Sequence, residues 1–423
     1  MHDHIEKLVD SVYSSKLKNG LQVLLHEDHT LPHAVMHTFW QIGARNEQPG
    51  LTGLAHFIEH MMFNGGKKYG PHQFDEIMEA HGGANNAYTN QNITVYQNSF
   101  PAEALAIIFD LEADRIAYLN LNKAAFAAER KVIASERRTT VESDNFELMS
   151  EMLWATAFQS HPYRWPVIGW HEDIQRWKLR DLQEFYRRHY TPKNATIVLV
   201  GDFDAEAAMR LCESYFGDIP LREALPLALE TEAPQTCERR ASVQRPAQLP
   251  AFTCGFHVPA STHPDYFALH LFEIVLAAGQ SSRCYQRLVD REQVAVWVRS
   301  EYSASLDPGL FILTVQLREE RGLPAGEKLL YEELQKLSEE PITASELRKA
   351  KNICQAAFVR GLTTMASKAE ALGSAALYFG DYRKLRELKH HYDAVTSNDI
   401  QRVAQKYFHS QNRTVVTLLP EPD

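Results

Sequence analysis

Residues 56–60 read H-x-x-E-H, which is the mirror order of the common zinc-protease signature. Residues three and four apart lie on one face of a helix, so His56, Glu59 and His60 are expected to project together. Two imidazole nitrogens in that arrangement can bind Zn²⁺ at about 2.0–2.1 Å, while the carboxylate between them stays free to transfer protons. The pattern predicts a metallopeptidase site, although an ordinary amphipathic helix with two surface histidines would carry the same letters.

The residues around this motif predict the helix that the chemistry requires. Pro49-Gly50 interrupts the preceding structure, Thr52 or Gly53 can begin the helix, and apolar residues recur through it with helical spacing. The segment 64–66, Asn-Gly-Gly, then ends it, because glycine readily adopts the left-handed conformation found after a helix C-terminus.

A zinc site also needs a third protein ligand and an open fourth position. The best candidate segment is 125–136, an alanine-rich run without Gly or Pro that is strongly helical. Glu129 and Glu136 lie two turns apart on one face of it, and Val132 and Ile133 are expected between them on the same side. The residue types leave open that both carboxylates instead form surface salt bridges with the basic residues beside them, Arg130, Lys131, Arg137 and Arg138.

These motifs resemble the pitrilysin, insulin-degrading enzyme and mitochondrial processing peptidase family of inverted zincins (inverzincins), and its short two-domain processing-peptidase-like branch fits best. In that family a glutamate ligand follows H-x-x-E-H some seventy-five residues later. Here seventy-five residues separate His60 from Glu136, and Glu129 matches a further family glutamate seven residues before the ligand. The segments G-G-A-N-N-A-Y-T at 82–89, M-M-F-N-G at 61–65 and G-L-A at 53–55 match as well.

The resemblance implies that His56, His60 and Glu136 bind one zinc ion per chain, with water in the fourth position. It implies that Glu59 is the general base and that Glu129 orients a ligand histidine. The implied activity is endoproteolytic hydrolysis of extended, unfolded peptides by zinc-activated water.

Asn86, Ala87 and Tyr88 resemble the substrate-binding edge strand of the same family. An extended peptide can pair with the main chain of such a strand, so its binding tolerates many sequences. The side chain of Tyr88 is expected to contribute less than the backbone of Ala87. Without the resemblance, the segment is a plain edge strand capped by its Gly-Gly and Asn-Asn turn.

An internal repeat divides the chain into two halves. D-L-Q at 181–183 and N-A-T-I-V at 194–198 recur 218 residues later as D-I-Q at 399–401 and N-R-T-V-V at 412–416. The repeat predicts a duplicated domain. Only the first copy carries H-x-x-E-H, because the corresponding helix of the second copy is mainly apolar.

We therefore expect an α+β fold with a catalytic, zinc-binding domain at 1–220, a proline-containing linker at 221–250 and a homologous non-catalytic domain at 251–423. Within each half, strand patterns are followed by long helices, which predicts a mainly antiparallel sheet with helices packed on one face. The resemblance implies that the two domains face each other as a clamshell.

One segment departs from the family pattern. Many members carry an arginine and a tyrosine in the second half, in a segment of the type L-R-x-x-E-Q-L-G-Y. Here Val289 and Val296 take those positions, and valine offers no hydrogen-bond donor; a shifted register would align Arg287, Arg291 or Tyr302 instead. We expect a heterodimer in which a homologous partner subunit supplies the pair. The alternative is a non-catalytic scaffold or core-type subunit of the same fold, against which the complete metal motif argues.

Composition narrows the remaining classes of protein to which this chain could belong. The 423 residues are 44% hydrophobic and 23% charged, which is typical of globular proteins. A net charge of −10 without a basic tract excludes a nucleic-acid binder, and five cysteines without C-x-x-C indicate neither a disulfide framework nor a cysteine zinc site. No apolar run is long enough to span a membrane, and the polar N-terminus shows no signal peptide. We expect a soluble protein, cytoplasmic or periplasmic; a processed form of an exported precursor would look identical.

Overall fold

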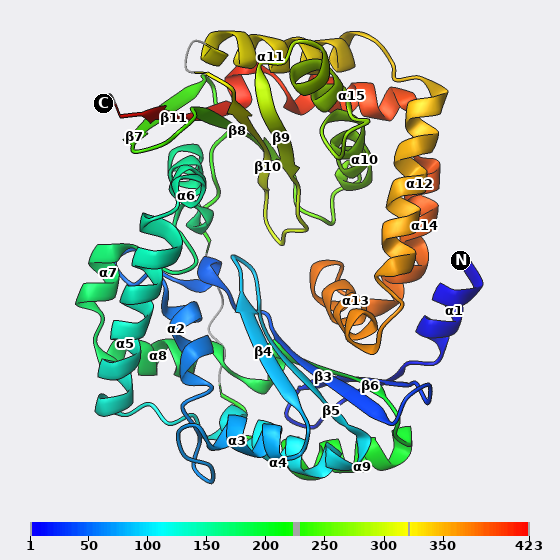
Figure 1. Ribbon diagram of the computed structural model, residues 1–423. Helices are drawn as coiled ribbons and strands as arrows, with labels where there is room; N and C mark the ends of the chain where they lie inside the picture. The colour runs from blue at the N-terminus through cyan, green and yellow to red at the C-terminus, as the bar shows by residue number, and fades with distance from the viewer. Residues whose placement is uncertain (1, 223–228, 320–321, 422–423) are drawn as a thin grey trace. The chain divides into compact units, whose positions relative to one another are not determined.

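The computed structural model describes residues 2–222, 229–319 and 322–421, which form two compact units (Figure 1). Unit 1 is assembled from Met1–Arg137, Trp165–Leu229 and Val359–Arg386. Unit 2 is assembled from Arg138–Arg164, Glu230–Phe358 and Glu387–Asp423. Each unit is therefore built from both halves of the chain.

A six-stranded sheet forms the centre of unit 1. Its neighbouring strands are antiparallel except β2 and β6, which run parallel. In spatial order the strands are β1 (Tyr13–Lys16), β2 (Gln22–Glu27), β6 (Ala195–Gly201), β3 (His33–Trp40), β5 (Thr94–Pro101) and β4 (Ala84–Thr89). A tight turn joins β1 to β2, with Gly20 at a φ of 87°. Strand β4 lies at the edge of this sheet.

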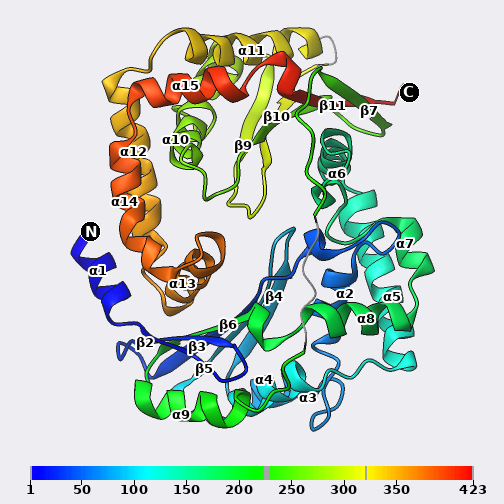
Figure 2. The same ribbon diagram turned by 180° about the vertical axis from the view of Figure 1, so that it is seen from behind.

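Nine α-helices of the described residues belong to unit 1. They are α1 (His2–Asp10), α2 (Leu54–Met61), α3 (Gln73–Ala80), α4 (Leu105–Ala117), α5 (Lys123–Arg137), α7 (His171–Arg176), α8 (Leu179–His189), α9 (Ala205–Phe216) and α13 (Met365–Tyr378). Figures 1 and 2 show α4 and α9 on one face of the sheet and α13 on the other.

Unit 2 repeats this plan around a five-stranded sheet. In spatial order its strands are β7 (Arg239–Arg245), β11 (Arg413–Pro420), β8 (Ala251–Val258), β10 (Gly309–Leu317) and β9 (Ala295–Glu301), with only β7 and β11 parallel among the described pairs. Its helices are α6 (Asn145–Ala157), α10 (Tyr266–Leu276), α11 (Leu323–Glu339) and α15 (Ser397–Tyr407). Helices α12 (Ala344–Arg360) and α14 (Leu385–Ala394) contribute residues to both units.

The two halves exchange one helix each, so the compact units differ from the contiguous ranges 1–220 and 251–423. Helix α13 packs on β3 and β6 of unit 1, and α6 packs on β7, β8 and β11 of unit 2. On α13, Gly373 lies so close to the sheet that a Cβ would meet the Phe39 ring at 2.1 Å. Strand β7 also lies within the range expected to be a linker.

Helices cover both faces of each sheet, where the sequence predicted one. In unit 2, alternate residues of β10 point to opposite sides: Phe311 and Leu313 pack against α10 and α15, whereas Leu310 and Ile312 pack against α6. The second face is covered by the exchanged helix, and an apolar stripe on a helix does not reveal which sheet it will cover.

Candidate metal centre

Helix α2 begins at a tightly constrained glycine. Gly53 has a φ of 87°, and a Cβ there would lie 2.5 Å from the carbonyl oxygen of Ile168. The buried carboxylate of Glu47 accepts hydrogen bonds from the backbone N–H groups of Gly53 (2.7 Å) and Ala55 (2.8 Å). The apolar side chains of α2 face the core and thereby fix the rotation of the helix. They are Leu54, Phe57, Ile58 and Met61.

The two histidines of α2 meet a carboxylate of α5. His56 Nε2 and His60 Nε2 lie 3.3 Å apart. The carboxylate of Glu136 lies 3.3 Å from His60 Nε2 and 3.7 Å from His56 Nε2. These three side chains form a group whose potential ligand atoms all lie within 4.8 Å of one another. The structure thus brings together the three residues predicted as zinc ligands.

The spacing of these atoms fits a tetrahedral metal ion. Zinc bonds of about 2.0–2.1 Å place neighbouring ligand atoms about 3.3 Å apart. The observed separations of 3.3 Å and 3.7 Å match that edge length. Two imidazole nitrogens and one carboxylate also form a donor set that zinc favours.

Glu129 contacts the same centre from a position two turns before Glu136 on α5. Its Oε1 lies 2.9 Å from His60 Nδ1, and its Oε2 accepts a hydrogen bond of 3.0 Å from Asn64 Nδ2. The adjacent Arg130 donates instead to the carbonyl of Trp177 at 3.3 Å. Glu129 therefore holds a histidine of the centre, which differs from the surface salt bridge that its residue type also allowed.

Between Glu129 and Glu136 on α5, one side-chain prediction was wrong. Val132 and Ile133 were expected on the same side of the helix. Ile133 is fully buried, whereas Val132 is 50% exposed. Adjacent residues on a helix point about 100° apart, so one of them is buried in the core and the other is exposed to solvent.

Glu59 lies beside the metal cluster and is held by the end of β4. Its Oε2 is 2.5 Å from the hydroxyl of Thr89, whose oxygen is also 3.0 Å from the hydroxyl of Thr94. Thr94 in turn donates to the carbonyl of Ile42 at 3.0 Å. Burial raises the pKa of Glu59 above its usual value, because a charged carboxylate is disfavoured away from water.

The two histidines differ in their affinity for protons. Burial, followed by the neighbouring His60, lowers the pKa of His56 to about 4. Burial acts against the charge on His60 too, but hydrogen bonds to Glu129 and Glu136 raise the pKa of His60 to about 9. The carboxylates of Glu129 and Glu136 therefore favour positive charge on His60, whereas burial disfavours it on His56.

Comparison with known proteins decides the family. A sequence model described as Insulinase (Peptidase family M16) matches residues 22–169, and one described as Peptidase M16 inactive domain matches residues 176–354. A Helicobacter pylori protein named zinc protease PqqE is 30% identical over 421 residues, covering 99% of this chain and 95% of that protein. This chain belongs to the M16 peptidase family.

Other M16 relatives extend this similarity. Mitochondrial-processing peptidase subunit beta of Lentinula edodes is 27% identical, over 93% of this chain and 86% of that one. The crystal structure of a protease from Helicobacter pylori superposes with a TM-score of 0.91 at 30% identity, covering 97% of this chain and 99% of that one. The predicted family and fold class are thus confirmed, and curated M16 relatives of this chain are named zinc proteases. Across the residues that the structure describes, no helix combines the length and apolarity needed to cross a bilayer.

The edge strand expected to bind substrate is present in this M16 chain as β4. Asn86, Ala87 and Tyr88 lie on it, paired with β5 on one side only. The Asn86 side chain accepts a hydrogen bond from the N–H of Ala87 at 2.9 Å. The hydroxyl of Tyr88 donates to Glu370 of α13 at 2.8 Å, so this side chain is bonded within unit 1. Substrate binding by these residues stays a prediction.

The positions that depart from the M16 arginine–tyrosine pattern lie at the start of β9 and just before it. Val289 is buried, and Val296 is 41% exposed on the edge strand β9. Of the three alternatives raised by a shifted register, Arg287 lies 3.4 Å from Glu292, and Tyr302 packs against the core of unit 2.

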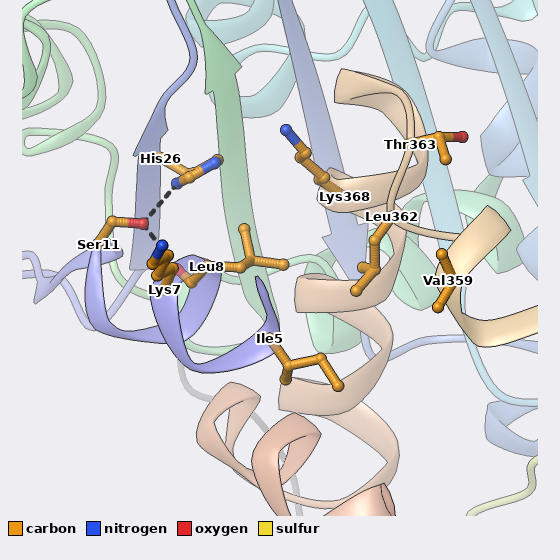
Figure 3. Close-up of a pocket in the computed structure, with 9 residues that line it drawn as sticks. All are labelled: Ile5, Lys7, Leu8, Ser11, His26, Val359, Leu362, Thr363 and Lys368. Atoms are coloured by element: carbon orange, nitrogen blue, oxygen red, sulfur yellow. Dashed lines mark hydrogen bonds between the residues drawn. The ribbon is translucent and has the colours of Figure 1, made fainter. Parts of the chain in front are cut away.

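A separate cavity of about 580 Å³ lies in unit 1 between α1, β2 and the connection from α12 to α13 (Figure 3). Ser11 donates to the carbonyl of Leu8 at 2.9 Å and lies 2.9 Å from His26 Nδ1. Lys368 donates to Asp28 at 2.6 Å. These polar groups are bonded within the protein, and none of the metal-centre residues lines the cavity.

Sequence reasoning did not assign a role in the site to Asn64, Thr89 or Glu47. Asn64 was interpreted only as the end of the helix, and Thr89 only as part of a family motif. Both reach their partners across long sequence separations, so residue spacing carries no signal for these contacts. The hydrogen-bonding residue types in the M-M-F-N-G and G-G-A-N-N-A-Y-T segments were the available clue.

Proposed function

We propose that this chain is a zinc-dependent endopeptidase that hydrolyses extended, unfolded peptides. The observation that carries the proposal is the convergence of His56 Nε2, His60 Nε2 and the Glu136 carboxylate at separations of 3.3–3.7 Å, with Glu59 on the same helix beside them. These three side chains would hold one zinc ion, and the zinc-protease names of the relatives support that metal.

Glu59 acts as the general base. When bound, zinc polarises the scissile carbonyl and makes water a better nucleophile at neutral pH. Glu59 accepts the proton of the attacking water and passes it to the leaving amine. The hydroxyl of Thr89, 2.5 Å from Glu59, fixes the direction of the carboxylate, and Glu129 holds His60 in place through its Nδ1.

The substrate binds as an added strand along β4. This edge strand ends at Thr89, which contacts the general base, so a peptide paired with Asn86, Ala87 and Tyr88 leads towards the reactive centre. Main-chain pairing requires an extended segment and tolerates varied side chains. This favours unfolded peptides over folded proteins.

The working enzyme is a heterodimer, in which a homologous subunit supplies an arginine and a tyrosine. Val289 and Val296 offer no polar group for the substrate or for a tetrahedral intermediate. The similarity to a subunit of mitochondrial-processing peptidase supports this arrangement. The complete set of proposed ligands and base argues against the scaffold alternative.

Two variants test the catalytic assignment. Glu59→Gln should keep zinc but lose about 10²–10⁴-fold in turnover of a quenched fluorescent peptide, because it removes proton transfer alone. His60→Ala should lose zinc and activity together. Normal cleavage by Glu59→Gln, measured on metal-loaded protein, would show that the general base lies elsewhere.

The heterodimer is tested separately. The purified chain, verified as a monomer by analytical ultracentrifugation, should cleave weakly, and activity should rise when a homologous subunit carrying the arginine and tyrosine is added. Full turnover by the monomer would remove the partner from the proposal while leaving the zinc peptidase intact.

A further inference from the structure

Asn64 occupies a fixed position directly after the metal helix. Its backbone N–H donates to the carbonyl of Met61 at 2.9 Å, which continues the turn of α2. The next residue, Gly65, has a φ of 88°, and a Cβ there would lie 2.5 Å from the carbonyl oxygen of Tyr69. The loop that follows is anchored by Asp114, which accepts hydrogen bonds from the backbone of Lys68 and Tyr69. The Asn64 side chain is therefore presented from a rigid turn.

The amide of Asn64 completes the hydrogen bonding of Glu129. One carboxylate oxygen of Glu129 is 2.9 Å from His60 Nδ1, and the other accepts from Asn64 Nδ2 at 3.0 Å. Asn64 Nδ2 is also 3.4 Å from the carbonyl of His60. With both oxygens engaged, the plane of the carboxylate is fixed, and so is the ring of His60 that donates to it.

We propose that Asn64 is a positioning residue of the metal centre: it orients Glu129 so that His60 presents its Nε2 towards His56 and Glu136. The inference rests on the proposed zinc function. A neutral donor suits this role better than a cation, because it fixes the carboxylate without neutralising the negative charge that makes His60 a stronger ligand. Asn64 thus differs from the arginines and lysines that commonly hold surface carboxylates.

Two substitutions separate geometry from charge. Asn64→Ala removes the donor and should lower zinc affinity about tenfold, the lower end of the range for outer partners of a metal ligand. Asn64→Asp keeps the shape but can only accept, and its charge repels Glu129, so its loss should be larger, up to about 100-fold. Asn85→Ala is the matched control, because Asn85 donates to the carboxylate of Asp75 at 2.8 Å away from the metal cluster.

The measurement is zinc affinity of the full chain by competition with a fluorescent chelator, together with the visible absorption of the Co²⁺-loaded protein as a report on ligand geometry. The decisive comparison is Glu129→Ala against Glu129→Ala/Asn64→Ala. If Asn64 acts through Glu129, the second substitution changes nothing further, and the Co²⁺ spectra of both variants agree. Wild-type zinc affinity in Asn64→Ala, or an unchanged tenfold loss in the Glu129→Ala background, would overturn the proposal. If the wild-type chain bound no zinc, the proposed zinc-dependent function would be wrong as well as the role of Asn64.

Discussion

Helix α2 of unit 1 and helix α10 of unit 2 hold corresponding places in the repeat but differ in chemistry. Each follows an eight-residue strand, β3 or β8, in the centre of its sheet. Helix α2 presents two histidines and a glutamate on one face, whereas every buried residue of α10 is apolar. The repeated fold thus accommodates either kind of helix at this place.

The comparison extends to the edge strands. Thr89 at the end of β4 contacts Glu59 of α2, and Ser300 on β9 hydrogen bonds to Glu273 of α10. Both units therefore join a helix glutamate to an edge-strand hydroxyl. Only in unit 1 does this pair lie beside two imidazoles; 218 residues after Glu136, the sequence has Cys354, which is buried. The contact is shared by the two units, and in unit 1 the proposed zinc ligands lie beside it.

The largest difference is expected from histidine replacements in the two units. His60→Ala removes a proposed ligand and should weaken zinc binding by more than about 100-fold, the upper limit for losing an outer partner. His270→Ala, on α10, removes a side chain that contacts the Tyr392 hydroxyl at 2.6 Å in unit 2, and should leave zinc binding unchanged. Equilibrium dialysis with metal analysis, after circular dichroism shows both variants folded, checks this. If both variants lost zinc to the same extent, the zinc site would not be the one proposed here.

Glu273 is the acidic residue of α10, and its protonation should change the free energy of unfolding of the protein. Burial raises the pKa of Glu273 to about 7. Between its ordinary pKa and about 7, the folded state keeps a proton that the unfolded state releases, so the free energy of unfolding falls as pH rises through this window. Glu273→Gln should therefore be more stable than the wild type at pH 8, by up to about 3 kcal/mol, and similar to it at pH 4.

Urea unfolding at both pH values measures this effect. Glu206→Gln serves as the control, because its carboxylate is 80% exposed in unit 1. A Glu273→Gln variant with the same stability as the wild type at pH 8 would contradict the raised pKa of this half-buried carboxyl group.

Local pattern predicted the elements well because it depends on near neighbours. The helix predicted around residues 56–60, beginning at Thr52 or Gly53, is α2, and Gly53 is the residue directly before it. The exchange of α6 and α13 was beyond such reasoning, since an apolar stripe predicts burial without naming the partner. Two interchangeable, homologous sheets offered the same kind of surface to either helix.

The residues of the candidate site also differ in how far the sequence alone could assign them. Spacing within one helix was enough to group His56, Glu59 and His60, because helical geometry fixes their face. Glu136 could be distinguished from a surface carboxylate only through the family resemblance, since its partners lie on another helix. Asn64 reaches Glu129 across 65 residues, and nothing in either local segment specifies that contact.

The paired edge-strand hydroxyls give a sharper test of the comparison. Thr89→Val keeps the shape but removes the hydrogen bond to Glu59, and a bond to a charged group contributes about 1.5–3 kcal/mol. We expect kcat to fall about 10–100-fold with zinc content unchanged. Ser300→Ala, the counterpart on β9, should leave kcat at the wild-type value. Quenched-peptide kinetics on both variants decide this, and an equal fall in kcat would mean that the hydroxyls serve only the fold.

The smallest effect is expected on the opposite face of β4. Successive side chains of a strand alternate, so Thr89 turns towards α2 while Tyr88 turns towards α13. There the Tyr88 hydroxyl donates to Glu370 at 2.8 Å, and Glu370 also binds Ser374 and faces His37 at 3.5 Å. The proposed substrate strand is thus tied from both faces, on one of them by the exchanged helix.

Tyr88→Phe removes one of these ties without touching the metal centre. The freed edge strand should bind an extended peptide less well, raising KM about two- to fivefold, as expected for the loss of one hydrogen bond, while kcat stays constant. Val296→Ala on β9 is the matched change in unit 2, at a side chain 41% exposed, and should alter neither constant. Steady-state kinetics with a long peptide separate the two constants. A fall in kcat at constant KM would mean that Tyr88 acts on the chemical step, and that α13 serves the reactive centre and not the binding strand.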